Sequence, residues 1–334
     1  MKEKISIIGA GSWGTTLAVN LAKKGIAVEL HSVFRDHNLQ MQKQRQNSLF
    51  LKGTKFPKSL QINLSLKETA KNEIIVIAIP VQYISGVIKK IKRQKISFKG
   101  KTLVSISKGI ETKSLKRVSQ IIEEELKPTN IAVLSGPNIA KEILAGVPST
   151  SILACKNKNI GKRLQVLFTN STFRVYLHKD VVGVELGGAL KNIIALSCGI
   201  SDGLGFGANT KAALVTRGLA EITRLGCRLG AKASTFWGIS GLGDLVTTCF
   251  SSHSRNRLVG EQLGKGKKLA DIIKKMKMVA EGIDTTESAY RLSKKLGVDM
   301  PITREVYSVL YQGKSPKKVV ADLMKRPLKV EKLN

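Results

Sequence analysis

The sequence predicts an α/β protein in which a doubly wound sheet is followed by an all-helical region. Through the first half of the chain, short apolar segments alternate with amphipathic helical segments, as in a parallel sheet covered on both faces. A glycine-rich turn follows the first apolar segment, and from Glu185 onward helical periodicity dominates. The length of 334 residues suggests about two domains, which we expect at 1–183 and 184–334.

Six segments of the first half are expected to be strands, because each is a short apolar run bounded by polar residues, glycine or proline. They cover residues 5–8, 27–30, 73–79, 103–106, 131–134 and 150–154. Helices are expected over 15–24, which Gly25 ends, over 83–91 and over 114–126. In the second half, helices are expected over 185–201, 209–228, 256–263, 269–276, 285–296, 304–311 and 316–324.

Composition excludes several classes of protein. Hydrophobic residues make up 42% of the chain, enough for packed cores. The longest apolar run, 74–81, is far shorter than the ~20 residues that span a bilayer, so no transmembrane segment is expected. The four cysteines show no Cys-x-x-Cys spacing, which argues against a zinc or disulfide scaffold and fits a reducing cytoplasm. We predict no metal site and a cytoplasmic location.

The net charge of +32 is the strongest signal in the composition. A basic patch often marks a nucleic-acid site, but the basic residues are spread along the chain. Only 89–95 and 265–277 are dense in lysine and arginine, and neither stretch has interleaved aromatic residues. We therefore expect a solvated lysine-rich surface and no specific nucleic-acid partner. A general attraction for anionic metabolites or lipid headgroups remains compatible with this charge.

The turn after the first strand has the pattern of a dinucleotide site of the Rossmann type. Gly9, Gly11 and Gly14 form a G-x-G-x-x-G motif between a predicted strand and a predicted helix, the context that the motif requires. The three glycines permit a tight turn, approach of backbone to a pyrophosphate and close helix–strand packing. The helix that follows presents free amide groups and the positive end of its dipole to an anion. Trp13 is either a wall of the cofactor site or surface cover.

The end of the second predicted strand bears on the choice of cofactor. This strand often ends in an acidic residue that binds the ribose 2′-hydroxyl of NAD. Here the chain continues His31-Ser32-Val33-Phe34-Arg35. Arg35 either pairs with the 2′-phosphate of NADP or is a solvated loop residue, so NADPH and NADH both remain candidates.

Lys191 is a candidate proton donor, because it interrupts an otherwise apolar helical stretch. Burial or a neighbouring cation can adapt a lysine to proton transfer. Its side chain either faces an internal pocket or extends to the surface. None of the four histidines falls in a catalytic pattern.

Further polar residues follow predicted strands or open predicted helices. Lys108 lies at the carboxyl end of a strand, where ligands bind in open α/β sheets. Gly136 and Asn138 follow the next strand, where backbone amides could bind a phosphate oxygen. Arginine suits bidentate phosphate contact, whereas aspartate and serine at such positions are equally suited to capping helices. The candidates of the second half are Asp244, Ser254, Arg255 and Asn256.

Together these segments resemble bacterial NAD(P)-dependent glycerol-3-phosphate dehydrogenase. The matching stretches run in the family's order and are Gly9-Ala-Gly-Ser-Trp-Gly-Thr, Ser107-Lys-Gly-Ile-Glu, Leu134-Ser-Gly-Pro, Val184-Glu-Leu-Gly-Gly-Ala-Leu-Lys-Asn-Ile, Gly238-Ile-Ser-Gly-Leu-Gly-Asp-Leu-Val-Thr-Thr-Cys, Ser254-Arg-Asn and Val279-Ala-Glu-Gly. The resemblance implies reversible reduction of dihydroxyacetone phosphate to sn-glycerol 3-phosphate by NAD(P)H, which supplies phospholipid synthesis. It also implies a homodimer.

The resemblance assigns roles by motif position. Lys191 would be the proton donor and acceptor, and Lys108 would contact both substrate and nicotinamide. The other residues implied at the substrate are Gly136, Asn138, Asp244, Ser254, Arg255 and Asn256, and those implied at the cofactor are Ser12, Trp13, Ala140, Arg255, Val279 and Glu281. Two positions depart from the family pattern: Asn138 stands where members often carry Ser or Thr, and Arg35 lies two residues beyond the usual arginine position.

Two other functions compete with this one. A dehydrogenase of the 3-hydroxyacid type shares a dinucleotide sheet and a helical second half, but would need a carboxylate site in place of Ser254-Arg255-Asn256. A non-enzymatic binder of nucleic acid or membrane surfaces would bind in a strongly salt-dependent manner, and Lys191→Ala would not affect it.

Overall fold

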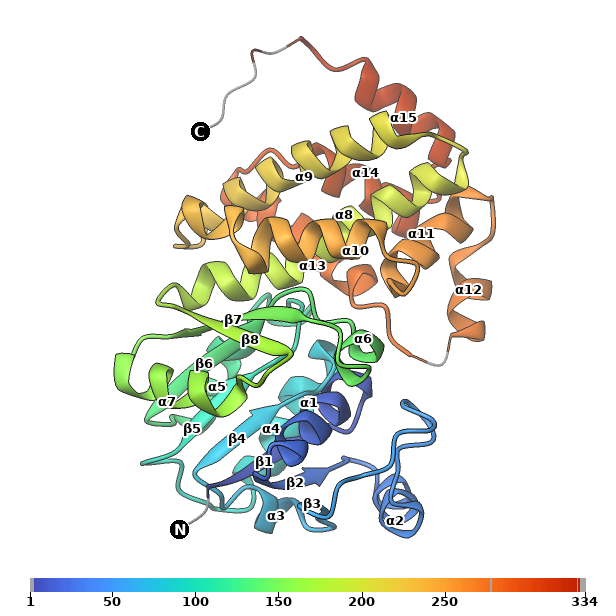
Figure 1. The fold of residues 1–334 in the computed structure, drawn as a ribbon. Coiled ribbons are helices and arrows are strands. Elements are labelled where there is room, and N and C mark those ends of the chain that lie inside the picture. Colours follow the sequence, from blue (N-terminus) through green and yellow to red (C-terminus); the bar gives the residue numbers. More distant parts are fainter. Residues whose placement is uncertain (1–2, 277, 329, 331–334) are drawn as a thin grey trace. The chain divides into compact units, whose positions relative to one another are not determined.

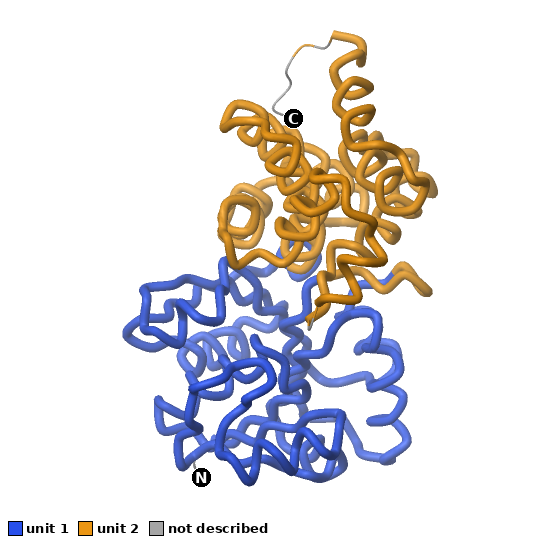
Figure 2. The backbone as a smooth tube through the Cα atoms, turned by 90° about the vertical axis from the view of Figure 1, so that its right-hand side faces the viewer, with its two compact units in different colours: residues 1–108, 116–184 blue, residues 109–115, 185–334 orange. Residues whose placement is uncertain are grey.

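The chain divides into two compact units (Figure 2). The computed structural model describes residues 3–276, 278–328 and 330. Unit 1 comprises residues 1–108 and 116–184, and unit 2 comprises residues 109–115 and 185–334. Segment 109–115 therefore groups with the second unit, whereas the expected division at 183/184 assigned it to the first. Lys277, at the end of the second basic stretch, lies outside the described residues.

Unit 1 is built on an eight-stranded sheet with the order β3-β2-β1-β4-β5-β6-β7-β8. Neighbouring strands are parallel except β6 and β7, which are antiparallel. The strands are β1 (Lys4–Ile8), β2 (Ala27–His31), β3 (Leu60–Ile62), β4 (Ile74–Ile77), β5 (Thr102–Ser105), β6 (Asn130–Ser135), β7 (Ser149–Cys155) and β8 (Phe173–His178). All six strands expected from the sequence are present.

Helices cover both faces of this sheet (Figure 1). They are α1 (Ser12–Lys23), α2 (Arg35–Gln44), α3 (Leu66–Thr69), η1 (Val81–Tyr83), α4 (Ile84–Lys92), α5 (Val118–Leu126), α6 (Ala140–Leu144) and α7 (Lys158–Phe168). Ile5 and Ile7 of β1 belong to one apolar core with α1, α6 and α7, whereas Ile8 belongs to a second core with α4 and α5. Successive side chains of a strand point to opposite faces, so the doubly wound prediction is confirmed.

Several elements of unit 1 depart from the expectations; α3 and α7, for example, were not among the expected helices. The expected helix over 114–126 begins only at Val118, because Leu115 adopts a left-handed backbone conformation with φ of 57°. The short strand β3 and the edge strand β8 were not expected, and β8 alternates buried and exposed residues instead of forming an apolar run. Helix α2 was also missed, since its buried face consists of His37, Asn38 and Met41.

Unit 2 is helical throughout, with no strand among its described residues. Its helices are α8 (Val181–Gly203), which begins at the end of unit 1, α9 (Ala208–Arg228), α10 (Asp244–Phe250), α11 (Arg255–Gly264), α12 (Leu269–Lys275), α13 (Gly282–Leu296), α14 (Pro301–Tyr311) and α15 (Pro316–Met324). A 3₁₀ segment, η2 (Ala233–Trp237), and a π-helical turn, η3 (Ile239–Gly243), precede α10. The expected all-helical second half is confirmed, and α10 is the helix that sequence patterning missed.

Helix α8 is long and apolar enough to cross a membrane by length and composition. However, 94% of its most apolar window is buried inside the protein. This helix contains no long uninterrupted apolar run, because Glu185 and Lys191 lie within it. Its burial is that of a core helix around which a helical unit is assembled.

Glycines bring α8 and α11 into backbone contact. Gly199 and Gly203 of α8 lie against Gly260 and Gly264 of α11, and both pairs have a spacing of four residues. A Cβ atom built on Gly260 would overlap the Leu196 carbonyl oxygen and lie 2.9 Å from the Ile200 amide nitrogen. The two helices can pack at this separation only because none of the four positions carries a side chain.

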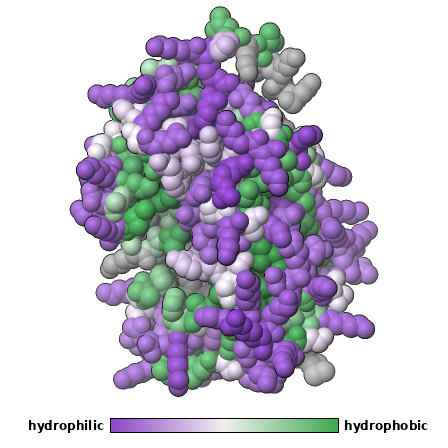
Figure 3. Space-filling model, turned by 180° about the vertical axis from the view of Figure 1, so that it is seen from behind, coloured by the Kyte–Doolittle hydropathy of each residue, from purple (hydrophilic) through white to green (hydrophobic). Residues whose placement is uncertain are grey.

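Hydrophilic residues are widely distributed on one face of the molecule, with apolar patches between them (Figure 3). A few lysines of unit 1 have acidic partners: Lys71 pairs with Glu68 at 2.7 Å, and Lys92 pairs with Glu125 at 3.0 Å. Basic residues outnumber acidic ones 56 to 24, so most of them cannot form such pairs, and surface pairs of this kind contribute little stability individually.

A buried carboxylate ties α9 to the start of α14. Glu221 is 1% exposed. Its carboxylate accepts hydrogen bonds from the amide nitrogens of Ile302 at 2.6 Å and Thr303 at 3.1 Å, and from Thr303 Oγ1 at 3.1 Å. These amides belong to the first turn of α14, where backbone donors lack helical partners. The buried Glu221 side chain thus accepts hydrogen bonds from first-turn amides of α14 that have no partner within the helix.

We expect this carboxylate to make stability depend on pH. Burial raises the pKa of Glu221 to about 7, against the opposing effect of the Ile302 and Thr303 hydrogen bonds. Since the raised pKa lies in the folded state, the stabilisation is complete below about pH 4.5 and is lost as the pH rises through 7. The free energy of unfolding should fall by about 2–3 kcal/mol between pH 5 and 8 on this account. Glu221→Gln should lack this component, and denaturant titrations showing equal pH dependence in both proteins would contradict the assignment.

Candidate active site

The glycine-rich turn at the carboxyl end of β1 has the shape of a phosphate cradle. Gly9 has a φ of 117°, and its amide donates to the His31 carbonyl at 2.8 Å. A Cβ atom on Gly9 would overlap Ala78, and one on Gly14 would overlap the Gly9 carbonyl, whereas one on Gly11 would meet nothing within 4 Å. Helix α1 begins at Ser12, and its N-cap Gly11 supplies no side-chain hydrogen bond. The first-turn amides are therefore presented toward open space, as a dinucleotide pyrophosphate requires.

An asparagine that sequence reasoning missed braces this turn. Asn47 Nδ2 donates to the Ala10 carbonyl and to Thr15 Oγ1, both at 2.8 Å. Asn47 Oδ1 lies 3.1 Å from His37 Nε2, and the same ring contacts Ser32 Oγ through Nδ1 at 3.1 Å. The loop after β2 and the glycine turn are thus joined by buried side chains. Asn47 lies outside every motif, so only the folded structure reveals this contact.

Trp13 and Arg35 flank this region in different ways. The Trp13 ring packs edge-on against Phe173 with centroids 6.3 Å apart, and it belongs to the margin of the sheet core. Its Nε1 atom is buried and has no hydrogen-bond partner among the described residues. Arg35 begins α2 and is exposed. An exposed arginine beside the second strand is available to a 2′-phosphate, and a solvated role is equally compatible with this position.

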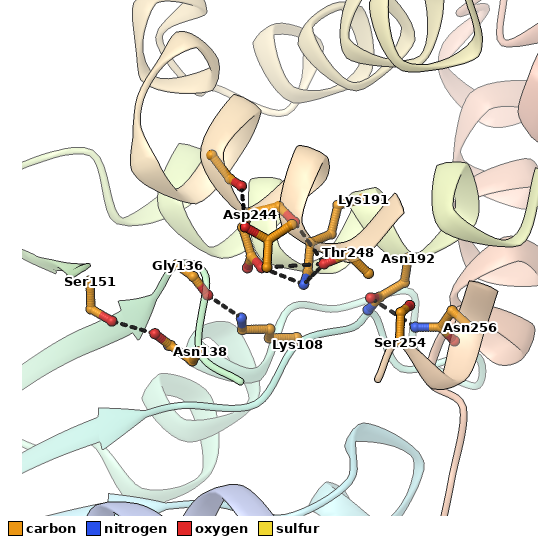
Figure 4. A network of polar contacts seen from close by, with 12 residues as sticks. Lys108, Gly136, Asn138, Ser151, Lys191, Asn192, Asp244, Thr248, Ser254 and Asn256 are labelled. Atoms are coloured by element: carbon orange, nitrogen blue, oxygen red, sulfur yellow. Dashed lines mark hydrogen bonds and ion pairs between the residues drawn. The ribbon is translucent and has the colours of Figure 1, made fainter. Parts of the chain in front are cut away.

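Lys108 lies directly beyond β5 in unit 1 and contacts the turn after β6 (Figure 4). Its Nζ donates to the Gly136 carbonyl at 2.7 Å. Gly136 has a φ of 137°, a conformation that favours glycine. Asn138 Oδ1 accepts from Ser151 Oγ at 2.6 Å, while Asn138 Nδ2 is buried without a partner among the described residues. A buried amide donor without a partner is costly, so this atom is suited to receive a ligand oxygen.

Lys191 is buried in unit 2 and pairs with an aspartate. Its residue exposure is 6% and that of Asp244 is 1%. Lys191 Nζ donates to Asp244 Oδ1 at 2.6 Å and to Thr248 Oγ1 at 2.5 Å (Figure 4). Thr248 Oγ1 in turn donates to the Asp244 carbonyl at 2.6 Å. Of the two orientations open to Lys191 in the sequence, extension to the surface is therefore excluded.

Two of the candidate residues were equally suited to capping helices, and the structure shows that Ser254 caps one whereas Asp244 does not. Asp244 does not cap α10: Gly243 occupies the N-cap position, and the Asp244 carboxylate faces Lys191. Ser254 is the N-cap of α11, and its Oγ accepts from the Arg257 amide at 3.2 Å. A capping role does not remove the second lone pair of this hydroxyl from use by a ligand.

Two buried asparagines extend the network from Lys191 toward α13. Asn256 Nδ2 donates to Asn192 Oδ1 at 2.9 Å, and the Gly282 amide donates to Asn256 Oδ1 at 3.0 Å. Arg255 Nη1 donates to the Val279 carbonyl at 2.7 Å. Within unit 2, side chains far apart in the sequence thus converge on the amino end of α13.

The structure therefore groups the sequence-predicted residues into two sets. Within unit 1, Gly9, Gly11, Ser12, Trp13 and Gly14 form the turn after β1, and Lys108, Gly136, Asn138 and Ala140 lie around the ends of β5 and β6. Within unit 2, the set is Lys191, Asp244, Ser254, Arg255, Asn256, Val279 and Glu281.

Two further polar residues of unit 2 were missed. Thr248 lies four residues after Asp244, on the same helical face, and Asn192 directly follows Lys191. Both positions could have been found from spacing once the helices were known. In the described ranges, no cluster of three or more His, Cys, Asp or Glu could hold a metal ion.

A nucleotide-binding sheet that carries this glycine turn, joined to a helical unit with a buried lysine–aspartate pair, defines an NAD(P)-dependent dehydrogenase. The model of the NAD-dependent glycerol-3-phosphate dehydrogenase N-terminus matches residues 4–161, and that of the corresponding C-terminus matches residues 180–321. The chain belongs to this family.

Individual relatives agree over nearly the whole length. Glycerol-3-phosphate dehydrogenase [NAD(P)+] of Citrifermentans bemidjiense is 49% identical, and the alignment covers 99% of each chain. The protein of the same name from Geobacter sulfurreducens is 48% identical, with 99% and 100% covered. Among solved structures, glycerol-3-phosphate dehydrogenase of Coxiella burnetii superposes with a TM-score of 0.93 at 37% identity, with coverage of 97% of this chain and 99% of that chain.

Proposed function

We propose that the protein catalyses the reversible reduction of dihydroxyacetone phosphate to sn-glycerol 3-phosphate by NAD(P)H. The observation that carries the proposal is the buried Lys191–Asp244 pair, with a separation of 2.6 Å, in a member of this family. The reaction consumes one NAD(P)H and one proton for each carbonyl reduced. It would supply the glycerol backbone of phospholipids in the cytoplasm.

Lys191 acts as the general acid in this proposal. When bound, NAD(P)H supplies the hydride that reduces the carbonyl carbon. Negative charge then develops on the carbonyl oxygen, and the Lys191 ammonium stabilises it and donates a proton. Asp244 and Thr248 hold the Lys191 side chain through their hydrogen bonds. In the reverse direction, the neutral lysine accepts the hydroxyl proton.

The remaining residues are proposed to bind ligands. Lys108 and Arg255 supply positive charge for the phosphorylated substrate and for the cofactor. Gly136, Asn138, Asp244, Ser254 and Asn256 are proposed substrate contacts. The proposed cofactor contacts are Gly9, Gly11, Ser12, Trp13, Gly14, Arg35, Lys108, Ala140, Arg255, Val279 and Glu281. The active protein is proposed to be a homodimer whose subunits divide into a cofactor domain, 1–183, and a catalytic domain, 184–334.

Oxidation of NADPH, and in parallel of NADH, with dihydroxyacetone phosphate tests the proposal. We expect the absorbance at 340 nm to fall only when this substrate is present. A higher kcat/KM with NADPH that falls in Arg35→Ala would assign Arg35 to the 2′-phosphate, and an unchanged preference would assign it to solvent. A folded protein that binds the dinucleotide but turns over only 3-hydroxyacid substrates would overturn the proposal.

A further inference from the structure

Segment 109–115, which follows Lys108 directly, is held by helix α13 of unit 2. Ser288 Oγ donates to the Ile110 carbonyl at 2.9 Å, and Arg291 Nη1 donates to the Thr112 carbonyl at 2.8 Å. Ser288 and Arg291 lie three residues apart on α13, which places them on one helical face. Two carbonyls of this segment, those of Ile110 and Thr112, are thus bound by two side chains of one helix.

The start of the segment is buried, whereas Lys113 and Ser114 are exposed. Ser288 and Ile110 are both 0% exposed, and Glu111 is 5% exposed. The Glu111 carboxylate accepts from Ser114 Oγ at 2.6 Å, and the Leu115 amide donates to the Glu111 carbonyl at 2.8 Å. The segment therefore closes on itself as a turn between Lys108 and α5. Ile110 itself is fully buried and its carbonyl is bound by Ser288, so its position is set by α13.

The same helix is connected through Asn256 to Asn192, the residue that follows Lys191 in α8. The Gly282 amide at the start of α13 donates to Asn256, and Asn256 donates to Asn192, the neighbour of Lys191. A Cβ atom on Gly282 would lie 2.8 Å from the Asn192 carbonyl oxygen, so α13 and α8 are in backbone contact here. Helix α13 thus carries both the Asn256 network and the binding site for segment 109–115.

Covalent geometry extends this constraint to Lys108. Consecutive Cα atoms are 3.8 Å apart, so the Lys108 Cα lies no more than about 7.6 Å from that of Ile110. Any displacement of Ile110 from α13 therefore permits displacement of Lys108. Misplacing a binding group by about 1 Å can lower the rate by as much as roughly a hundredfold.

We propose that Ser288, assisted by Arg291, is a positioning residue that holds Lys108 in place through the Ile110 carbonyl. The inference rests on the proposed function, because it takes Lys108 to contact the substrate. Within the described part of the chain, the Ser288 and Arg291 side chains donate hydrogen bonds to the carbonyls of Ile110, Asp284 and Thr112. None of these three residues belongs to the proposed site. Their effect on catalysis would be exerted through the backbone alone.

Ser288→Ala is the central variant, and Ser293→Ala is its matched control. Ser293 is a buried serine of the same helix whose hydroxyl donates only within α13, to the Tyr290 carbonyl at 2.8 Å. We expect Ser288→Ala to lower kcat/KM for dihydroxyacetone phosphate by roughly tenfold or more, with the Kd for NADPH within twofold of that of the wild type. Ser293→Ala should leave both unchanged. Ser288→Thr, which retains a hydroxyl, should recover part of the loss.

A double-variant cycle with Lys108→Ala separates positioning from general destabilisation. If Ser288 acts through Lys108, adding Ser288→Ala to Lys108→Ala should change kcat/KM by less than about twofold. The same tenfold loss in both backgrounds would overturn the proposal, as would wild-type kinetics in Ser288→Ala. If Ser288→Ala does not fold, Arg291→Ala, which changes an exposed contact, is carried through the same cycle.

Hydrogen exchange tests the contact independently of turnover. Amides of residues 110–115 should exchange faster in Ser288→Ala than in the wild type and in Ser293→Ala. Equal exchange in all three proteins would overturn the inference even if turnover were affected. Absence of wild-type turnover with dihydroxyacetone phosphate would instead overturn the proposed function. If the wild type lacks this turnover but Ser288→Ala still speeds exchange of residues 110–115, Ser288 has a structural role only, and its positioning role is refuted as well.

Discussion

Lys191→Ala is expected to lower kcat by at least about 10³-fold while the Kd for NADPH stays within a few-fold of that of the wild type. Lys191 is the proposed proton donor, and its ammonium also stabilises the charge that develops on the carbonyl oxygen. The dinucleotide turn after β1 belongs to unit 1, whereas Lys191 belongs to unit 2. Stopped-flow or steady-state oxidation of NADPH measures kcat, and NADPH fluorescence titration measures the Kd.

Lys211→Ala is the matched control for this experiment. Lys211 is also a partly buried lysine of unit 2, and its Nζ pairs with Asp202 at 2.7 Å with side-chain exposures of 16% and 17%. Loss of an ion pair is common to both variants, but only Lys191→Ala removes the proposed acid. A similar kcat in both variants, or full turnover in Lys191→Ala, would refute the assignment.

Removal of Lys191 also leaves the Asp244 carboxylate buried without its cation, which destabilises a protein by about 3–5 kcal/mol. The double variant Lys191→Met/Asp244→Asn removes both charges. We expect it to regain much of the lost stability, measured by chemical denaturation, without regaining turnover. Recovery of turnover together with stability would show that Lys191 has a structural role only.

Gly260→Ala is expected to destabilise the protein by about 3 kcal/mol or more. The added methyl group would overlap the Leu196 carbonyl oxygen and lie 3.0 Å from the Gly199 Cα. Every neighbouring atom is backbone, so no side chain can rotate away, and α11 must move away from α8. For a unit of this size, each kcal/mol corresponds to roughly 2–4 °C in Tm, so thermal unfolding should shift by roughly 6–12 °C.

Gly86→Ala provides the opposite expectation at a comparable position. Gly86 is also a helix-interior glycine, but a Cβ atom there would meet nothing within 4 Å. The substitution should stabilise the protein by about 0.4–1 kcal/mol, because alanine restricts the unfolded chain and favours the helix. Equal shifts in Tm for both variants would show that the close approach of α8 and α11 is not the cause.

The sequence predicted those parts of the fold that rest on local patterns. Apolar runs such as 74–79 identified the strands, because strands covered on both faces need continuous hydrophobic residues. The antiparallel orientation of β7 left no such signal, since an apolar run reads the same in either direction. Helix α2 was missed for the opposite reason, because polar residues such as His37 and Asn38 form its buried face.

For the candidate site, motif position proved more informative than local pattern. The surroundings of Lys191 left burial and surface extension both open, and only the fold places Asp244 and Thr248 beside it. Asn47 and Ser288 could not be found from the sequence, since each acts across a long separation and belongs to no motif. The residues proposed to contact ligands lie in recognisable motifs, whereas Asn47 and Ser288 do not.

The attachment of segment 109–115 to α13 has a consequence for biosynthesis. Its bond from Ser288 to Ile110 spans 178 residues of sequence. At about 5–20 residues per second, the ribosome adds those residues over roughly 9–36 s. During this interval the segment has emerged but its partner helix does not exist, so its carbonyls are bonded to water or to a chaperone. The sheet can form early in translation, but the segment beside Lys108 reaches its final place only when synthesis is nearly complete.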